Sequence, residues 1–348
     1  MNIPEMPTKM PTNEIFNKEL NERVGIGERI SLELRDVPEI DYENFDSIKD
    51  EMIQKIGIEN EEDFVLLESM MGLRLNISRN IERVKMINGN NKDKDIFRNY
   101  AIEDAEWMDL IAEHITSINN DSSLKKKEKL DKIHLFWKDL ERAYKDFEIY
   151  YKDFTASLKE DNLDFDCKKN GILGQVAAED LVNGINEISE ELNIKEISIR
   201  SSTSKEDVDE KIDFYVSIEY LNGLTNTMPC QVKAHKNTSY TGRFILDNLI
   251  TKVTKISNDE LKLSRDIKVP SAAEEQIIKD LEIFKERALT EHKEGLFIII
   301  PYGKAVYRKT KRKVEEVDLL GENGQAHERL KEAFVSQLKE RKVLDLKI

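Results

Sequence analysis

Residues 211–218 read KIDFYVSI and residues 230–234 read CQVKA, and a turn-like segment separates them. In the first stretch Asp213 alternates with apolar side chains, and in the second Gln231 and Lys233 do the same. Successive side chains on a β-strand point to opposite faces of the sheet, so each stretch predicts a strand with one polar and one apolar face. We expect the two strands to pair and to gather the three polar groups on one side.

A carboxylate, an amide and an ammonium group on one face suit phosphodiester chemistry. A divalent cation such as Mg²⁺ prefers oxygen ligands, neutralises phosphate and lowers the pKa of its bound water. Asp213 offers a carboxylate, Gln231 a side-chain oxygen and Val232 a backbone carbonyl. Lys233 would stabilise negative charge developing on the phosphate or help to deprotonate the water. This interpretation predicts a metal-dependent nuclease that uses Mg²⁺ or Mn²⁺.

Residues 171–256 resemble the PD-(D/E)XK nuclease superfamily, the fold of many restriction and repair endonucleases. The resemblance rests on GQVAAE at residues 174–179, which opens a helix, on KIDF at residues 211–214 and on QVK at residues 231–233. It covers about a quarter of the chain. It implies a mixed central sheet and hydrolysis of nucleic acid.

The resemblance also implies roles for four residues. Glu179, Asp213 and Gln231 would bind the metal, and Lys233 would act on the attacking water, so all four are catalytic candidates. Most members of the superfamily have Glu or Asp where this chain has Gln231. A Q-x-K variant occurs in the superfamily, including Mrr-like restriction enzymes, and implies weaker metal binding.

The turn between the two strands bears on this interpretation. Asn222-Gly223 favours a two-residue type I′ turn, which would pair Asp213 with Val232 and put Gln231 on the opposite face. A longer loop, or a bulge near Pro229, would return Gln231 to the face of Asp213. The nuclease interpretation therefore predicts that the tight hairpin does not form with an unbroken ladder.

Each predicted site residue also has a purely structural explanation. Asp213 follows the acidic stretch at residues 206–210 and can be its last charge. Gln231 and Lys233 can form the solvated face of an edge strand. Glu179 lies in the first turn of the expected helix, where acidic side chains stabilise the helix dipole. The nuclease interpretation depends on the order in which the four residues occur.

Basic residues after the second strand are candidates for substrate binding. Residues 231–268 contain eight Lys and Arg against four Asp and Glu, and residues 304–313 contain six basic residues and no acidic one. Lys236 and Arg243 are the predicted phosphate-binding residues, because cations beside the metal can hold a phosphate. Alternatively, both basic stretches are solvated surfaces.

The chain divides near residue 160 into a helical and a mixed part. Residues 1–12 contain three prolines and predict a disordered tail. Residues 13–160 have helical periodicity and predict an all-α domain. Residues 161–348 predict an α/β restriction-endonuclease-like domain with a mixed central sheet, so the fold class is α+β overall.

The spacing of apolar residues predicts individual elements. In the first part, helices are expected over about 61–87, from Asp93 or Asp95 onward, and over about 122–158. In the second part, helices are expected over about 174–192, 244–256, 272–291 and 325–342. Strands are expected at 197–202, in the two stretches quoted first, and at 297–301 and 304–307 around Tyr302-Gly303.

Composition favours a cytoplasmic protein. The 348 residues include two cysteines, Cys167 and Cys230, without metal-ligand or disulfide spacing, which suits a reducing compartment. No apolar run approaches the roughly 20 residues of a membrane span. The N-terminal residues lack an apolar secretory core. We therefore expect no membrane association.

The distribution of charge separates the expected partners. The net charge of −15 is concentrated in residues 1–160, which carry −11, whereas residues 161–348 carry −4. The acidic helical part is a poor nucleic-acid binder, so we expect it to contact a protein partner or a second copy of the chain. The second part is expected to bind nucleic acid, DNA rather than RNA.

Two functions of different classes remain open at this point. The first is the metal-dependent nuclease. The second is a catalytically inactive protein on a nuclease fold that serves as a protein- or nucleic-acid-interaction module, with Gln231 marking lost metal binding. RNA as the substrate is a third, weaker hypothesis. The sequence contains no phosphate-binding loop, dinucleotide glycine motif or zinc-ligand spacing.

Overall fold

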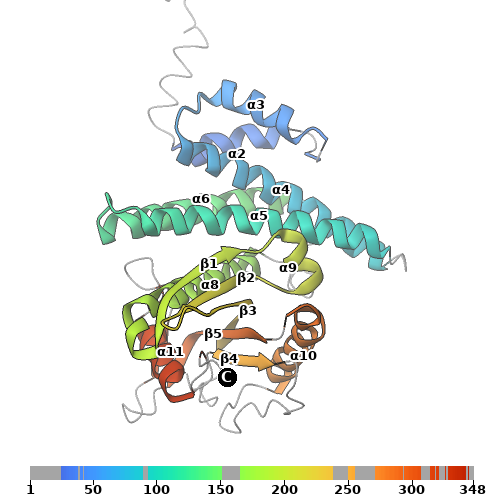
Figure 1. Cartoon of the computed structure of the whole chain (residues 1–348). Coiled ribbons are helices and arrows are strands. Elements are labelled where there is room, and N and C mark those ends of the chain that lie inside the picture. Colours follow the sequence, from blue (N-terminus) through green and yellow to red (C-terminus); the bar gives the residue numbers. More distant parts are fainter. Residues whose placement is uncertain are drawn as a thin grey trace, which may run out of the picture.

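The computed structural model arranges the chain in a helical layer and a layer built on a β-sheet (Figure 1). It describes residues 25–37, 40–41, 43–88, 93–150, 165–237, 250–254, 271–292, 294–306, 314–317, 319–320, 326, 328–341 and 344. The predicted tail at residues 1–12 lies outside the described residues.

The helical layer comprises α2 (Ile26–Asp36), α3 (Phe45–Ile56), α4 (Glu61–Asn88), α5 (Lys94–Asn120) and α6 (Lys126–Tyr150). The Asp93 side chain accepts the backbone N–H groups of Asp95 and Ile96, which caps α5. The helices expected from residue 61 and from residue 93 are thereby confirmed. In the described part of the chain, no helix combines the length and apolar character that a membrane crossing needs.

Helix α8 (Phe165–Asn183) contributes to two hydrophobic cores. Phe165 and Val176 pack into the core of the helical layer, whereas Ala177 and Leu181 pack against the sheet. A Cβ atom on Gly174 would lie 2.7 Å from the Cβ of Ala234, so glycine lets α8 approach the sheet closely. The helical layer and the sheet are therefore joined by a shared helix.

The sheet is mixed and has the strand order β1-β2-β3-β5-β4, with β6 pairing the far end of β5. Its strands are β1 (Ile194–Ser201), β2 (Phe214–Tyr220), β3 (Thr225–Asn237), β4 (Ile250–Thr254), β5 (Glu294–Val306) and β6 (Val314–Val317). Strands β3 and β5 are parallel, and the other pairs are antiparallel. The expected α+β class with a mixed sheet is confirmed.

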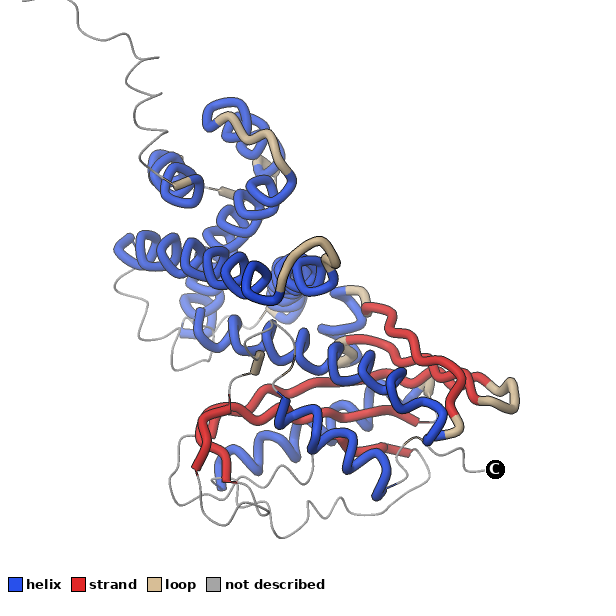
Figure 2. Tube along the Cα trace, turned by 90° about the vertical axis from the view of Figure 1, so that its left-hand side faces the viewer, coloured by secondary structure: helices blue, strands red, loops and turns tan. Residues whose placement is uncertain are grey.

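Helices cover both faces of the sheet (Figure 2). Apolar residues of α8 and of α11 (Glu328–Arg341) share one core with residues such as Phe214, Cys230 and Ile298. Phe284 of α10 (Ser271–Arg287) packs with Phe297 on the other face. Strands β2 and β5 therefore present one set of side chains to α8 and the alternate set to α10.

The structure corrects three predicted elements. Residues 250–254, expected within a helix, form β4, because this β-branched segment pairs with Leu296 and Ile298 of β5. The strands expected on either side of Tyr302-Gly303 are one continuous strand, β5. The helix expected from residue 174 begins at Phe165 and continues as the 3₁₀ segment Gly184–Leu192.

Candidate active site

The loop between β2 and β3 sets which residues of the two strands share a face. The Gly223 N–H donates to Tyr220 O at 2.9 Å, the Tyr220 N–H donates to Leu224 O at 2.9 Å, and Gly223 has φ +80°. This is a three-residue loop in which glycine supplies the left-handed conformation. The tight two-residue turn does not form, as the nuclease interpretation requires.

The resulting register places Asp213 opposite Gln231. Phe214 pairs with Cys230, so one further step along the hairpin brings Asp213 to Gln231. Lys233 follows two residues later on the same strand, and side chains two apart share a face. The hairpin therefore gathers Asp213, Gln231 and Lys233 on the α10 face of the sheet.

Asp213 directly precedes β2, at the point where β3 extends past the end of its pairing with β2. Its N–H donates to Cys230 O at 2.8 Å. Its Oδ2 accepts the backbone N–H of Val232, which the ladder with β2 no longer reaches. This backbone donor holds the carboxylate in place through Oδ2. The second carboxylate oxygen, Oδ1, takes no part in this bond.

Gln231 is a buried polar residue with an unsatisfied oxygen. Its side chain is 1% exposed, and within the described residues Oε1 has no hydrogen-bond partner. A buried acceptor without a donor costs about 1–3 kcal/mol. A hydrogen-bond donor or a hard cation bound beside Asp213 would satisfy this oxygen.

Half-buried charged side chains surround Asp213. Burial raises the pKa of Asp213 to about 7, and the negative charge of Asp207 raises it further, whereas the charges of Lys233 and Lys211 lower it. The carboxylate at 213 and the ammonium at 233 thus interact across one face. The two lysines make this a mixed cluster in which the acidic groups are partly balanced.

Asp207 is a member of this cluster that the sequence analysis did not single out. It lies on the short helix α9 (Ser204–Glu210), and burial raises its pKa while Lys211 and Lys233 lower it. Thr203 and Glu206 form a capping box at the start of α9. The Thr-x-x-Glu spacing is a recognised helix-start signal, and it would have placed Asp207 on a helix just before Asp213.

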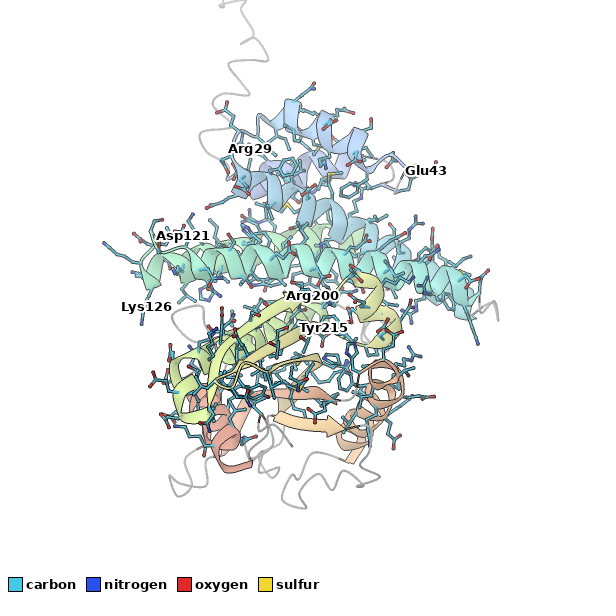
Figure 3. The ribbon with its side chains drawn as sticks, viewed as in Figure 1. Arg29, Glu43, Asp121, Lys126, Arg200 and Tyr215 are labelled. Carbon is cyan, nitrogen blue, oxygen red and sulfur yellow. The ribbon has the colours of Figure 1, made fainter. Side chains whose placement is uncertain are left out.

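Arg200 was also not predicted from the sequence as a site residue, and it lies on the same face of the sheet as Asp213. It pairs with Tyr215 in the β1–β2 ladder, and its guanidinium lies 4.1 Å from the centre of the Tyr215 ring (Figure 3). The Tyr215 hydroxyl donates to Glu206 at 2.9 Å. The Arg200 side chain is 61% exposed, and its guanidinium lies 4.0 Å from Glu206 Oε1, so its positive charge is partly compensated.

Glu179 lies in a different environment from the other predicted site residues. It lines a pocket of about 310 Å³ between α5, α8 and the end of β1, together with Asp109 and Glu113. Its Oε1 accepts Gln175 Nε2 at 3.2 Å. Burial raises the pKa of Glu179 to about 7, and the charges of Asp109 and Glu113 raise it further.

The two environments adjoin but do not merge. Neither Asp213, Gln231 nor Lys233 lines the pocket of Glu179. Ser202 lines that pocket, and its hydroxyl donates to Asp213 O at 2.9 Å. The structure thus brings three of the four predicted catalytic residues together and places Glu179 against α5.

Of the remaining predicted residues, Val232 alone contributes to the described geometry. Val232 donates its N–H to Asp213, as described above. Lys236 belongs to β3, and its side chain lies outside the described residues. Arg243 lies outside the described residues altogether.

The donor set fits a hard cation only in part. The Asp213 carboxylate and the unsatisfied Gln231 oxygen are ligands that Mg²⁺ accepts. In the described ranges no group of three or more His, Cys, Asp or Glu side chains is arranged to hold a metal. A cation at Asp213 and Gln231 would therefore depend on water and substrate oxygens for its other ligands.

Comparison of the chain with protein-family models, with curated proteins and with solved structures found no match. Function is accordingly inferred from the residues of this chain.

Proposed function

We propose that this protein is a metal-dependent nuclease that hydrolyses phosphodiester bonds, in DNA rather than RNA, on a restriction-endonuclease-like sheet. The observation that carries the proposal is the shared face of Asp213, Gln231 and Lys233, with a buried Gln231 oxygen that has no partner among the described residues. A bound Mg²⁺ or Mn²⁺ would neutralise the phosphate and lower the pKa of its water.

The residues of the site have distinct roles under this proposal. Asp213 and Gln231 hold the cation through side-chain oxygens, and the Val232 N–H keeps the Asp213 carboxylate in place. Lys233 stabilises the negative charge that develops on the phosphate. The exposed guanidinium of Arg200, which pairs with Glu206 at 4.0 Å, would exchange that partner for a phosphate of the nucleic-acid backbone at this face.

The acidic helical layer serves a different purpose in this proposal. Residues 1–160 carry a net charge of −11, which disfavours binding to phosphates. We assign this layer to contact with a protein partner or a second copy of the chain. The sheet layer then carries the catalytic chemistry.

A cleavage assay tests the nuclease. Purified protein is incubated with plasmid DNA, single-stranded DNA and RNA, each with Mg²⁺, with Mn²⁺ and with a chelator. The wild type is compared with Asp213→Asn and Lys233→Met, and with the matched surface variants Asp50→Asn and Lys205→Met, whose parent side chains are exposed. Cleavage by the wild type and both surface variants, lost in the two site variants and with chelator, is the expected result. Equal cleavage by all five proteins would identify a contaminant and refute the proposal.

One observation favours the alternative of an inactive interaction module. The described residues provide no three-carboxylate metal site, and Asp213 is already bonded to Val232 and balanced by lysines. Under this alternative the wild type binds DNA without cutting it, and Lys233→Met weakens binding. The same cleavage assay, paired with a DNA-binding titration, separates the two functions.

A further inference from the structure

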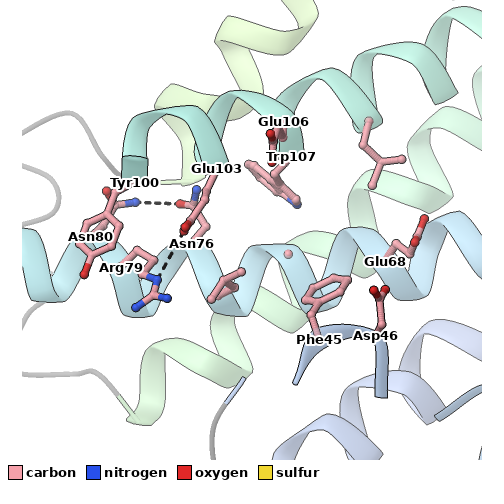
Figure 4. Close-up of a pocket in the computed structure, with 13 residues that line it drawn as sticks. Phe45, Asp46, Glu68, Asn76, Arg79, Asn80, Tyr100, Glu103, Glu106 and Trp107 are labelled. Atoms are coloured by element: carbon pink, nitrogen blue, oxygen red, sulfur yellow. Dashed lines mark hydrogen bonds and ion pairs between the residues drawn. The ribbon is translucent and has the colours of Figure 1, made fainter. Parts of the chain in front are cut away.

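A pocket of about 330 Å³ lies between α4 and α5, and the start of α3 closes one end (Figure 4). Phe45, Leu75, Trp107 and Leu110 supply its apolar walls. Small-molecule sites typically enclose roughly 300–1,000 Å³ and combine apolar walls with a few polar groups. This pocket belongs to the helical layer, and none of the candidate catalytic residues lines it.

The aromatic wall of the pocket is rigid. A Cβ atom on Gly72 would lie 2.5 Å from Cδ1 of Trp107, so the indole packs directly on α4 at the glycine. Trp107 Nε1 donates to Ser69 O at 2.9 Å. The indole is therefore held in place before any ligand arrives, which reduces the entropy lost on binding.

Fixed polar groups form one end of the pocket (Figure 4). Asn80 Nδ2 donates to Asn76 Oδ1 at 2.7 Å, and both amides are buried. Arg79 pairs with Glu103 at 3.4 Å and lies 5.0 Å from the centre of the Tyr100 ring. The guanidinium is thus already paired, and this end carries no uncompensated positive charge.

The other end of the pocket is acidic. Asp46 and Glu68 share a single cation, Lys49, at 3.1 and 2.9 Å. Counting all lining residues, four carboxylates (Asp46, Glu68, Glu103 and Glu106) face one guanidinium, that of Arg79. At the acidic end, Asp46 and Glu68 together carry one more charge than their shared cation, Lys49. The pocket therefore attracts cations and repels anions.

We propose that this pocket binds a small organic cation, with its ammonium group at Asp46 and Glu68 and its apolar or aromatic body against Phe45, Leu75 and Trp107. Charge complementarity selects the ammonium, and the rigid indole adds apolar contact with the body of the ligand. The inference is independent of the proposed nuclease activity, because it uses no residue of the sheet.

Calorimetric titration of the full-length chain with three probes tests both halves of the proposal. Tryptamine has an ammonium group and an aromatic body, indole-3-acetate has a similar body with the opposite charge, and ethylamine has the charge without the body. Tryptamine is expected to bind at least roughly tenfold more tightly than either analogue. Absence of saturable binding of tryptamine up to roughly 5 mM, or equal binding of indole-3-acetate, would overturn the proposal.

Two variants locate the binding site. Glu68→Gln removes one of the two carboxylates at the acidic end, and Leu110→Trp fills part of the cavity from α5. Each is expected to weaken tryptamine binding about tenfold, whereas Glu51→Gln on the exposed surface of α3 leaves it unchanged. Circular dichroism checks that each variant is folded. If both folded pocket variants bind tryptamine as the wild type does, tryptamine binds elsewhere and the proposal fails.

Discussion

Asp213 and Glu179 are both half-buried carboxyl groups with a pKa raised to about 7, yet their surroundings differ. At Asp213 the negative charge of Asp207 adds to the rise in pKa, whereas the positive charges of Lys233 and Lys211 oppose it. At Glu179 the neighbouring charges are those of Asp109 and Glu113, which raise the pKa further, and the hydrogen bond from the Gln175 amide lowers it. The charge of a carboxylate flanked by both cations and an acid is partly balanced, whereas a carboxyl group flanked by acids is suited to holding a proton. The same residue type thus acquires different chemistry from its neighbours.

The largest expected difference between the two carboxyl groups is in catalysis. Asp213→Asn should reduce Mg²⁺-dependent DNA cleavage on the order of 10³-fold, because it removes the negative charge of the proposed metal ligand that shares a face with Gln231 and Lys233. Glu179→Gln, a change of the same kind in the neighbouring pocket, should retain activity within about tenfold. Initial cleavage rates measure both. A loss in Glu179→Gln as large as that in Asp213→Asn would show that Glu179 joins the site after all.

A second difference is the pH dependence of stability. The pKa of Glu179 rises from 4.5 to about 7 on folding, so ionisation destabilises the folded state increasingly as pH rises through this interval. Glu179→Gln removes that cost and should be more stable than wild type by up to roughly 3 kcal/mol near pH 8. The gain should vanish near pH 4, where the carboxyl is protonated in both states.

Denaturation by urea at roughly pH 4 and roughly pH 8 measures this effect. The exposed Glu187→Gln variant on the segment after α8 serves as the control and should track the wild type at both pH values. A Glu179→Gln gain that is equal at both pH values would mean that the buried charge is not its cause.

A smaller contrast is expected between two glutamines. Gln231→Leu removes a buried oxygen without a partner in the described structure, so it should raise the free energy of unfolding by about 1 kcal/mol while abolishing cleavage. Gln175→Leu removes the amide that donates to Glu179, so it should lower stability. Urea denaturation and the cleavage assay measure both. Destabilisation by Gln231→Leu would indicate that its oxygen is satisfied in solution.

The smallest expected effect concerns the helix that carries Asp207. Thr203→Ala removes the capping box of α9 and should destabilise this helix by about 1 kcal/mol. Faster hydrogen exchange of the α9 backbone amides, with unchanged exchange in α4, would show this loss of stability. Thr203→Ser keeps the hydroxyl acceptor, so the α9 amides of this variant should exchange at the wild-type rate. An unchanged rate in Thr203→Ala would show that tertiary contacts hold α9 without its cap.

Several elements could be predicted from local sequence because their causes are local. Asp93 caps α5, and α4 begins at the predicted Glu61. The strand at residues 250–254 was misassigned because its structure depends on pairing with β5, about 45 residues away. Asp207 belongs to the acidic stretch at residues 206–210, and the helix that carries it is signalled only by the spacing of Thr203 and Glu206.

The sequence by itself determined that Gln231 and Lys233 share a face, since side chains alternate along any strand. It also determined the acidic bias of the first 160 residues. Only the tertiary structure decided that Asp213 joins that face, because the three-residue loop shifts the register by one and a one-residue shift exchanges the faces. It alone decided that Glu179 turns toward α5, because the position of a helix on a sheet depends on packing between residues far apart in the chain.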